Sequence, residues 1–204
     1  MVRLNTATPV GCRAHLLDRD VDCVSPEDDA LTQMAFLAIP PMIPSGEMTM
    51  TLKLNPDVGE PVVVALPLRV GSGRYDYERI DLPPDRQSLL DPALSQFERE
   101  KISRMRTIRT AARMWEYPFV RPVESAITSY FGSRRSYGYG FGSYHAGSDF
   151  DGVGGEPVVA PASGTVIMAE QLVVRGNAVL VDHGWGMISG FWHLSEIGVE
   201  VGQR

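Results

Sequence analysis

The sequence predicts a mainly β protein in two parts joined by a helix. Three observations lead to this prediction. Short apolar runs are separated by turn residues, with 20 Gly and 15 Pro among 204 residues. One run, residues 48–54, alternates strictly between apolar and polar residues, as a half-buried strand does. Between the two β-rich parts lies a single stretch whose apolar residues recur at helical spacing.

Residues 1–82 are expected to form a small antiparallel β-sandwich of roughly immunoglobulin-like type. The candidate strands are residues 35–39, 48–54 and 62–70, which Pro- and Gly-containing turns separate. Alternation places four apolar residues of the second strand on one, buried side: Met48, Met50, Leu52 and Leu54.

Residues 83–118 are expected to be a linker followed by an amphipathic helix. Asp91 and Pro92 have the residue types of an N-cap and a first helical position. The helical pattern reaches about Glu116, and it consists of Leu94, Phe97, Met105, Ile108, Ala112 and Trp115. Its polar side is rich in arginine. We interpret that side as a solvated face; the alternative is attraction to anionic glycan or teichoic polymers.

The C-terminal part, residues 119–204, becomes β-rich again. Its candidate strands are 126–131, 157–160, 165–171, 177–182 and 187–193, with Gly-rich connections between them.

Composition and charge exclude little but favour a globular protein. Apolar residues make up 44% and charged residues 22% of the chain, which argues against wholesale disorder. A net charge of -6 gives no reason to expect nucleic acid as a partner. No apolar run reaches the ~18–20 residues that a membrane span needs. The first residues lack the apolar segment of a signal peptide, so they do not reveal the protein's location.

The chain has two cysteines, Cys12 and Cys23. Their spacing is not that of a metal or redox motif. Two alternatives stay open at this stage: a disulfide in an oxidising compartment, or two isolated buried thiols.

Three of the four histidines lie in the last third of the chain: His145, His183 and His193. His145 and Asp149 are both suitable zinc ligands, but four residues of straight strand would hold them about 13 Å apart. The chain must therefore fold back if they share an ion, and Gly147 supplies conformational freedom. His183 stands between Asp182 and Gly184 in ordinary turn chemistry, so we interpret it as structural.

His193 ends a predicted strand. Simple alternation puts Ser189, Phe191 and His193 on one face of that strand. Trp192 and Leu194 would then lie on the other face. A lone histidine beside aromatic residues is more often a packing residue than a catalyst.

Several motifs together resemble the lysostaphin/LytM-type zinc metallopeptidases, which are peptidoglycan endopeptidases. Residues 127–135, ITSYFGSRR, look like the "TSxFGxRR" motif of that family, and 145–150, HAGSDF, follow at the family's spacing. Further matching segments are 155–158, 160–166, 176–177, 181–184 and 192–195. The similarity extends over about residues 119–204.

The resemblance implies a barrel-sandwich fold (a duplicated hybrid motif) for the C-terminal part, with zinc as cofactor. It makes His145 and Asp149 zinc ligands and His193 a catalytic histidine. The implied reaction is hydrolysis of peptide cross-links in bacterial cell-wall peptidoglycan, by a protein outside the cytoplasm. Family members supply a further zinc ligand from an H-x-H motif, which the 204 residues do not contain. We therefore expect weak zinc binding and little turnover from this chain.

Trp192, Tyr144 and the loop with Tyr137, Tyr139 and Phe141 are candidates for lining a peptide-binding groove. The alternative for that loop is a simple Gly-aromatic turn.

Two other classes of function compete with the enzyme. One is a catalytically inactive LytM-like regulator or scaffold of cell-wall hydrolases, which usually lacks the H-x-x-x-D pair that this chain retains. The other is a biotinyl- or lipoyl-type carrier, which residues 157–166 resemble. A carrier needs a lysine at its hairpin tip, and none follows Lys101.

Overall fold

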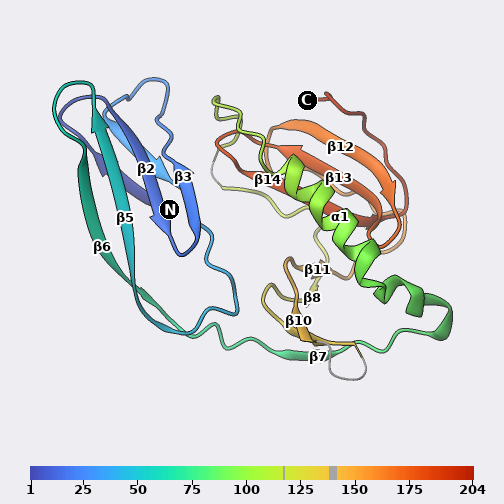
Figure 1. Ribbon diagram of the computed structural model, residues 1–204. Helices are drawn as coiled ribbons and strands as arrows, with labels where there is room; N and C mark the ends of the chain where they lie inside the picture. The colour runs from blue at the N-terminus through green and yellow to red at the C-terminus, as the bar shows by residue number, and fades with distance from the viewer. Residues whose placement is uncertain (117, 138–141) are drawn as a thin grey trace. The chain divides into compact units, whose positions relative to one another are not determined.

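The computed structural model describes residues 1–116, 118–137 and 142–204 (Figure 1). The chain forms two compact units, Met1–Asp76 and Tyr77–Arg204. Both are built mainly from strands, which confirms the predicted mainly β class. The finer division into 1–82, 83–118 and 119–204 stays a prediction; the first strand of the second unit already occupies Tyr77–Arg79.

The first unit contains a four-stranded and a two-stranded sheet. The larger has the order β3-β2-β5-β6, and the smaller pairs β1 with β4, all antiparallel. The bounds are β1 Val2–Asn5, β2 Val10–Leu16, β3 Arg19–Asp22, β4 Thr32–Ala35, β5 Gly46–Pro56 and β6 Val62–Val70. Strand β4 ends where its pairing with β1 ends, at Val2 opposite Ala35, so it does not extend over the predicted residues 36–39.

One apolar cluster lies between these two sheets. Met50 and Leu52 of β5 are its largest fully buried side chains, and Met48 and Leu54 pack against it. The predicted buried face of residues 48–54 is therefore confirmed. Ala35 contributes from the two-stranded sheet, so the cluster joins both layers.

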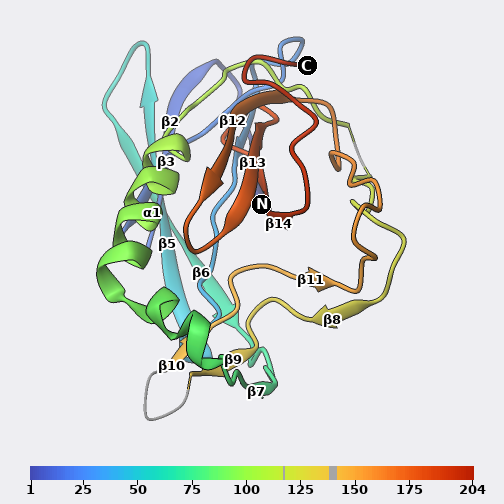
Figure 2. The ribbon, with the colours of Figure 1, turned by 90° about the vertical axis from the view of Figure 1, so that its right-hand side faces the viewer.

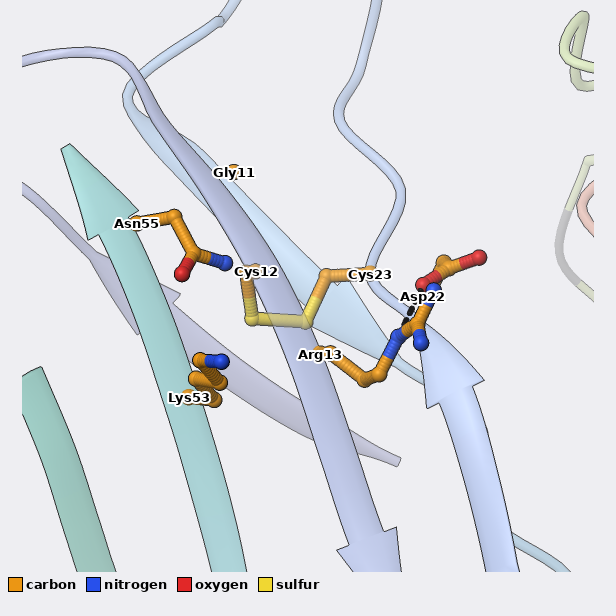
Figure 3. A pocket seen from close by; sticks show the side chains of 7 residues that line it. All are labelled: Gly11, Cys12, Arg13, Asp22, Cys23, Lys53 and Asn55. Atoms are coloured by element: carbon orange, nitrogen blue, oxygen red, sulfur yellow. Dashed lines mark hydrogen bonds and ion pairs between the residues drawn. A yellow bond between two sulfur atoms is a disulfide. The ribbon is translucent and has the colours of Figure 1, made fainter. Parts of the chain in front are cut away.

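Cys12 and Cys23 form a disulfide, with their Cα atoms 5.1 Å apart (Figure 3). The hairpin of β2 and β3 brings them together, because Arg13 pairs with Asp22 one position further along the ladder. The backbone N–H of Cys23 also donates to the carbonyl of Cys12. Of the two alternatives, the disulfide is the one found.

The second unit begins with β7 (Tyr77–Arg79), a 3-10 helix η1 (Pro84–Leu90) and helix α1 (Pro92–Met105). The Asp91 side chain accepts a hydrogen bond from the N–H of Ala93, as the sequence predicts for an N-cap. The helix ends at Met105, however, and not near residue 116. Beyond it the backbone pairs with the 183–185 turn, through Thr110 and Met114.

The buried face of α1 also differs from the prediction. Ile102 and Glu98 are the buried residues of the helix, whereas Phe97, predicted to be on the apolar face, is 64% exposed. Ile102 packs on the sheet that follows, and Lys101 forms an ion pair with Glu170 of that sheet. Tertiary contacts with one sheet thus select the inward face.

Three sheets make up the rest of the second unit. Helix α1 lies against the sheet with the longest strands, which has the order β12-β13-β14; Figure 1 shows α1 in front of this sheet and Figure 2 shows it at the side. The strands are β8 Ile127–Ser129, β9 Arg134–Ser136, β10 Gly142–Tyr144, β11 Asp149–Phe150, β12 Thr165–Leu172, β13 Gly176–Asp182 and β14 Ile188–Leu194. β7 pairs with β9 in parallel, β9 with β10 and β8 with β11 antiparallel.

Residues 157–160, predicted as a strand, form no strand. The segment makes isolated backbone hydrogen bonds to its neighbours, from Val159 to Pro122 and from Val120 to Pro161. Prolines at these positions lack an N–H and interrupt any longer ladder.

No helix among the described residues is long and apolar enough to cross a membrane.

Candidate metal centre

His145 and Asp149 converge, as the fold-back prediction requires. Nε2 of His145 lies 3.1 Å from Oδ1 of Asp149. A bend at residues 146–147 joins β10 to β11 and returns the chain. Two backbone hydrogen bonds fix His145 against the preceding turn, because its N–H donates to Ser133 and its carbonyl accepts from Gly132.

The separation of these two donor atoms fits one metal ion. Zinc binds nitrogen and oxygen ligands at about 2.0–2.2 Å, so two corners of a tetrahedral site lie about 3.4 Å apart. The imidazole ring is 11% exposed and the Asp149 side chain 52%, so the pair is open on the carboxylate side. Among the described residues, no group of three or more His, Cys, Asp or Glu side chains could hold a metal. The pair therefore provides two ligands.

Three side chains surround the pair: Ser129, Arg135 and Glu78. Ser129 Oγ lies 2.9 Å from His145 Nδ1 and 2.7 Å from Glu78 Oε1. Arg135 donates to Ser129, to Glu78 and to Oδ2 of Asp149, at 2.9, 2.9 and 2.7 Å. Strand register explains the assembly, since Glu78 stands opposite Arg135 and Ser129 opposite Asp149.

The sequence alone did not reveal this network. Ser129 and Arg135 lie in the motif at 127–135, but they carried no predicted role. Glu78 lies 51 residues before Ser129, in what we predicted to be the N-terminal part. No local pattern around Glu78 indicates that it faces the site.

Two pKa values at the site are displaced. Burial lowers the pKa of His145; the negative charge of Asp149 opposes this shift, and the positive charge of Arg135 adds to it. The hydrogen bond from Ser129 holds the pKa of Glu78 below its usual range, with Arg135 acting in the same direction against the effect of burial. A neutral imidazole and an ionised glutamate are the forms these shifts favour.

His193 lies in a different sheet, on β14. Among the described residues, no hydrogen bond or ion pair joins it to His145 or Asp149. Its place at the metal pair therefore stays a prediction. The residue is exposed, and its backbone N–H donates to the carbonyl of Arg175.

The predicted alternation along 187–194 is wrong at its end. Asn177 pairs with Leu194 and Val179 with Phe191, so two residues of β14 lie opposite Ala178 alone. This is a β-bulge, and His193 has a φ of 57° there. Leu194 consequently joins Phe191 in one apolar cluster, while Trp192 packs in the other, with Ile102 of α1.

His183 is structural, as we interpreted it from the sequence. It is buried, and both ring nitrogens have partners: Nδ1 lies 2.9 Å from the Ser163 carbonyl and Nε2 2.8 Å from Ser189 Oγ. Phe119 packs edge-on against the ring.

Part of the predicted groove can be placed. Tyr144 is exposed directly before His145. Tyr130, which we did not predict for the groove, is exposed after Ser129. Trp192 packs against the cluster under α1. Tyr139 and Phe141 lie outside the described residues, so their predicted role in the groove stays a prediction.

Fold and site together define the second unit as a β domain with a metal-donor pair. Residues 143–204, which contain His145, Asp149 and His193, match the sequence model of Peptidase family M23. The resemblance to LytM-type peptidases that the motifs indicated is thereby confirmed for residues 143–204.

A solved structure supports the fold over the whole chain. It is a crystal structure of a protein from Pseudomonas aeruginosa provisionally assigned to peptidase M23. The TM-score is 0.64 at 24% sequence identity, over 99% of this chain and 75% of that one. No curated protein matches the chain.

Proposed function

We propose that the protein is a zinc metalloendopeptidase that hydrolyses peptide bonds of bacterial peptidoglycan. The single observation that carries the proposal is the 3.1 Å approach of His145 Nε2 to Asp149 Oδ1 within a region that matches a peptidase family. When bound, zinc would lower the pKa of water and polarise the scissile carbonyl. His145 and Asp149 would hold it, each with one donor atom.

The other residues of the site have narrower proposed roles. His193 is the proposed catalytic histidine, which would transfer a proton or stabilise developing charge at the scissile carbonyl. Its exposed position on a bulge supports this role, because bulges re-aim side chains and occur often beside active sites. Exposed Tyr144 and Tyr130 flank the donor pair in sequence and offer apolar surface to an extended peptide.

A location outside the cytoplasm is also part of the proposal. The Cys12–Cys23 disulfide supports it, because such bonds persist mainly in oxidising compartments such as the periplasm or the extracellular space.

Zinc content tests the metal site. At equilibrium with excess zinc, the purified chain should bind about one zinc ion per molecule, with low affinity because the described residues supply two protein ligands. His145→Ala and Asp149→Ala should each lose it. His15→Ala is the matched control, since His15 pairs with Asp20 in the first unit and should not affect the metal. Unchanged zinc content in both site variants would contradict the proposed site.

Purified cell-wall sacculi test the reaction. Zinc-loaded protein should release new amino groups and no new reducing sugars, and His193→Ala should abolish the release while keeping zinc. The rate should be low, because the described residues supply two of the three protein ligands usual in catalytic zinc sites. If prolonged incubation yields no zinc-dependent amino groups, the endopeptidase assignment is wrong, and the inactive regulator replaces it.

A further inference from the structure

We infer that Glu78, Ser129 and Arg135 are positioning residues that present His145 Nε2 and Asp149 Oδ1 to the metal ion. The inference rests on the proposed function, and it assigns a task to side chains that belong to no ligand set. Each of the three reaches the donor pair through hydrogen bonds of 2.7–2.9 Å.

The hydroxyl proton of Ser129 determines the donor and the acceptor in the hydrogen bonds that link Glu78, Ser129 and His145. The Glu78 carboxylate is ion-paired with Arg135, so it can only accept hydrogen bonds. Ser129 Oγ, 2.7 Å from Glu78 Oε1, must therefore donate its single hydroxyl proton to that oxygen. Its two lone pairs remain to accept, and Arg135 Nη2 occupies one of them.

The second lone pair of Ser129 faces the histidine. Nδ1 of His145 lies 2.9 Å away, and it must carry the proton because Ser129 has none left to give. A neutral imidazole protonated on Nδ1 keeps an unprotonated Nε2. That nitrogen is the one beside Asp149, so the network selects the tautomer that a metal ion requires.

Arg135 performs the matching task for the carboxylate. Its Nε donates to Glu78, which orients the planar guanidinium, and its Nη2 then donates to Asp149 Oδ2. With Oδ2 engaged, Oδ1 alone faces Nε2 of His145, which favours coordination through one oxygen. A lysine carries the same charge but has no planar fork with which to join three partners.

The strand pairings show why residues so far apart in sequence assemble here. Parallel pairing of β7 with β9 sets Glu78 beside Arg135, and antiparallel pairing of β8 with β11 sets Ser129 beside Asp149. Figure 2 shows β8 and β11 side by side, apart from the β12-β13-β14 sheet. The Arg135 side chain is only 16% exposed, so water competes little for its contacts.

Zinc affinity, measured on the full chain by competition with a chromophoric chelator, tests the inference. Ser129→Ala, Arg135→Lys and Glu78→Gln should each weaken zinc binding about 10- to 100-fold, the usual effect of losing a partner of a metal ligand. The matched control is Arg134→Lys, the exposed neighbour on the same strand, which should leave affinity unchanged. Affinities equal to wild type in all three variants would overturn the inference.

A second measurement does not depend on how well the variants fold. In the zinc-bound wild-type protein, ¹⁵N chemical shifts of the His145 ring should show a protonated Nδ1 and a metal-bound Nε2, and Ser129→Thr should preserve this state. The opposite tautomer in the wild type would overturn the inference.

The two proposals fail in different ways. If the wild type binds no zinc through His145 and Asp149, the proposed function falls. If it binds zinc, and only the positioning variants are without effect, the proposed function stands and this inference falls.

Discussion

Two carboxylate–arginine networks in the second unit make an instructive comparison: Glu98 with Arg175, and Glu78 with Arg135. Both join segments that are far apart in the chain, by hydrogen bonds of 2.8 and 2.9 Å. Glu98 is 2% exposed, and its other oxygen accepts the backbone N–H of Val174. It thus fastens helix α1 to the turn between β12 and β13.

The Glu78 network ends differently. Its members contact one another and then the side chains of the proposed metal ligands. It is also less buried, since the Glu78 side chain is 24% exposed. The same chemical pair thus fixes a backbone turn in one place and contacts the side chains of the proposed metal ligands in another. The further groups that each pair contacts, a backbone N–H in the first case and the donor side chains in the second, distinguish the two networks.

Breaking the Glu98 pair should have the largest effect on stability. Glu98→Ala leaves Arg175 without its carboxylate and Val174 without an acceptor. We expect a loss of about 2–4 kcal/mol in the free energy of unfolding, somewhat below the loss for a fully buried pair. All three tryptophans (Trp115, Trp185 and Trp192) belong to the second unit, so urea denaturation followed by tryptophan fluorescence measures it selectively.

Phe97→Ala is the matched control on the same helix. Because Phe97 is 64% exposed, the free energy of unfolding should stay within about 0.5 kcal/mol of the wild type. An equal loss from both substitutions would mean that Glu98 has no special part in holding α1.

A change in the turn that Glu98 fastens should have an intermediate effect. Gly176 has a φ of 62°, and a Cβ there would lie 3.5 Å from Cα of His193. Gly176→Ala should therefore cost about 1–2 kcal/mol through left-handed backbone strain. In the same fluorescence assay, Gly142→Ala serves as control, because its Cβ would meet open space. Equal stability of Gly176→Ala and the wild type would contradict the strained turn.

The Glu78 network should give the smallest effect on stability, and one that depends on pH. The folded-state pKa of Glu78 is lowered, so the ionised carboxylate stabilises the fold above the ~4.3 of a free glutamate. That contribution is lost as the pH falls through the folded-state pKa. At pH 7 the free energy of unfolding of the wild type should exceed that of Glu78→Gln by about 1 kcal/mol or less, because the pair is partly exposed.

The difference between wild type and Glu78→Gln should shrink toward zero as the pH is lowered from 6 to about 3. Unfolding curves of both proteins across this range measure it. A difference that does not change with pH would show that the ionised form of Glu78 adds nothing to the fold.

Local patterns in the sequence determined several features of this protein. Alternation predicted the buried side of β5, and the Asp-Pro pair predicted the start of α1, because each depends on neighbouring residues alone. The motif around His145 and Asp149 identified the donor pair by resemblance, and the structure brings the two side chains together.

Only the tertiary structure decided the rest. Glu78 reaches the site through the pairing of β7 with β9, strands more than 50 residues apart, and no local pattern encodes such a register. The bulge at His193 and the end of α1 at Met105 likewise depend on partners from other segments. Pairing register and the choice of a buried face arise from contacts across the fold, so a single sequence read in windows does not contain them.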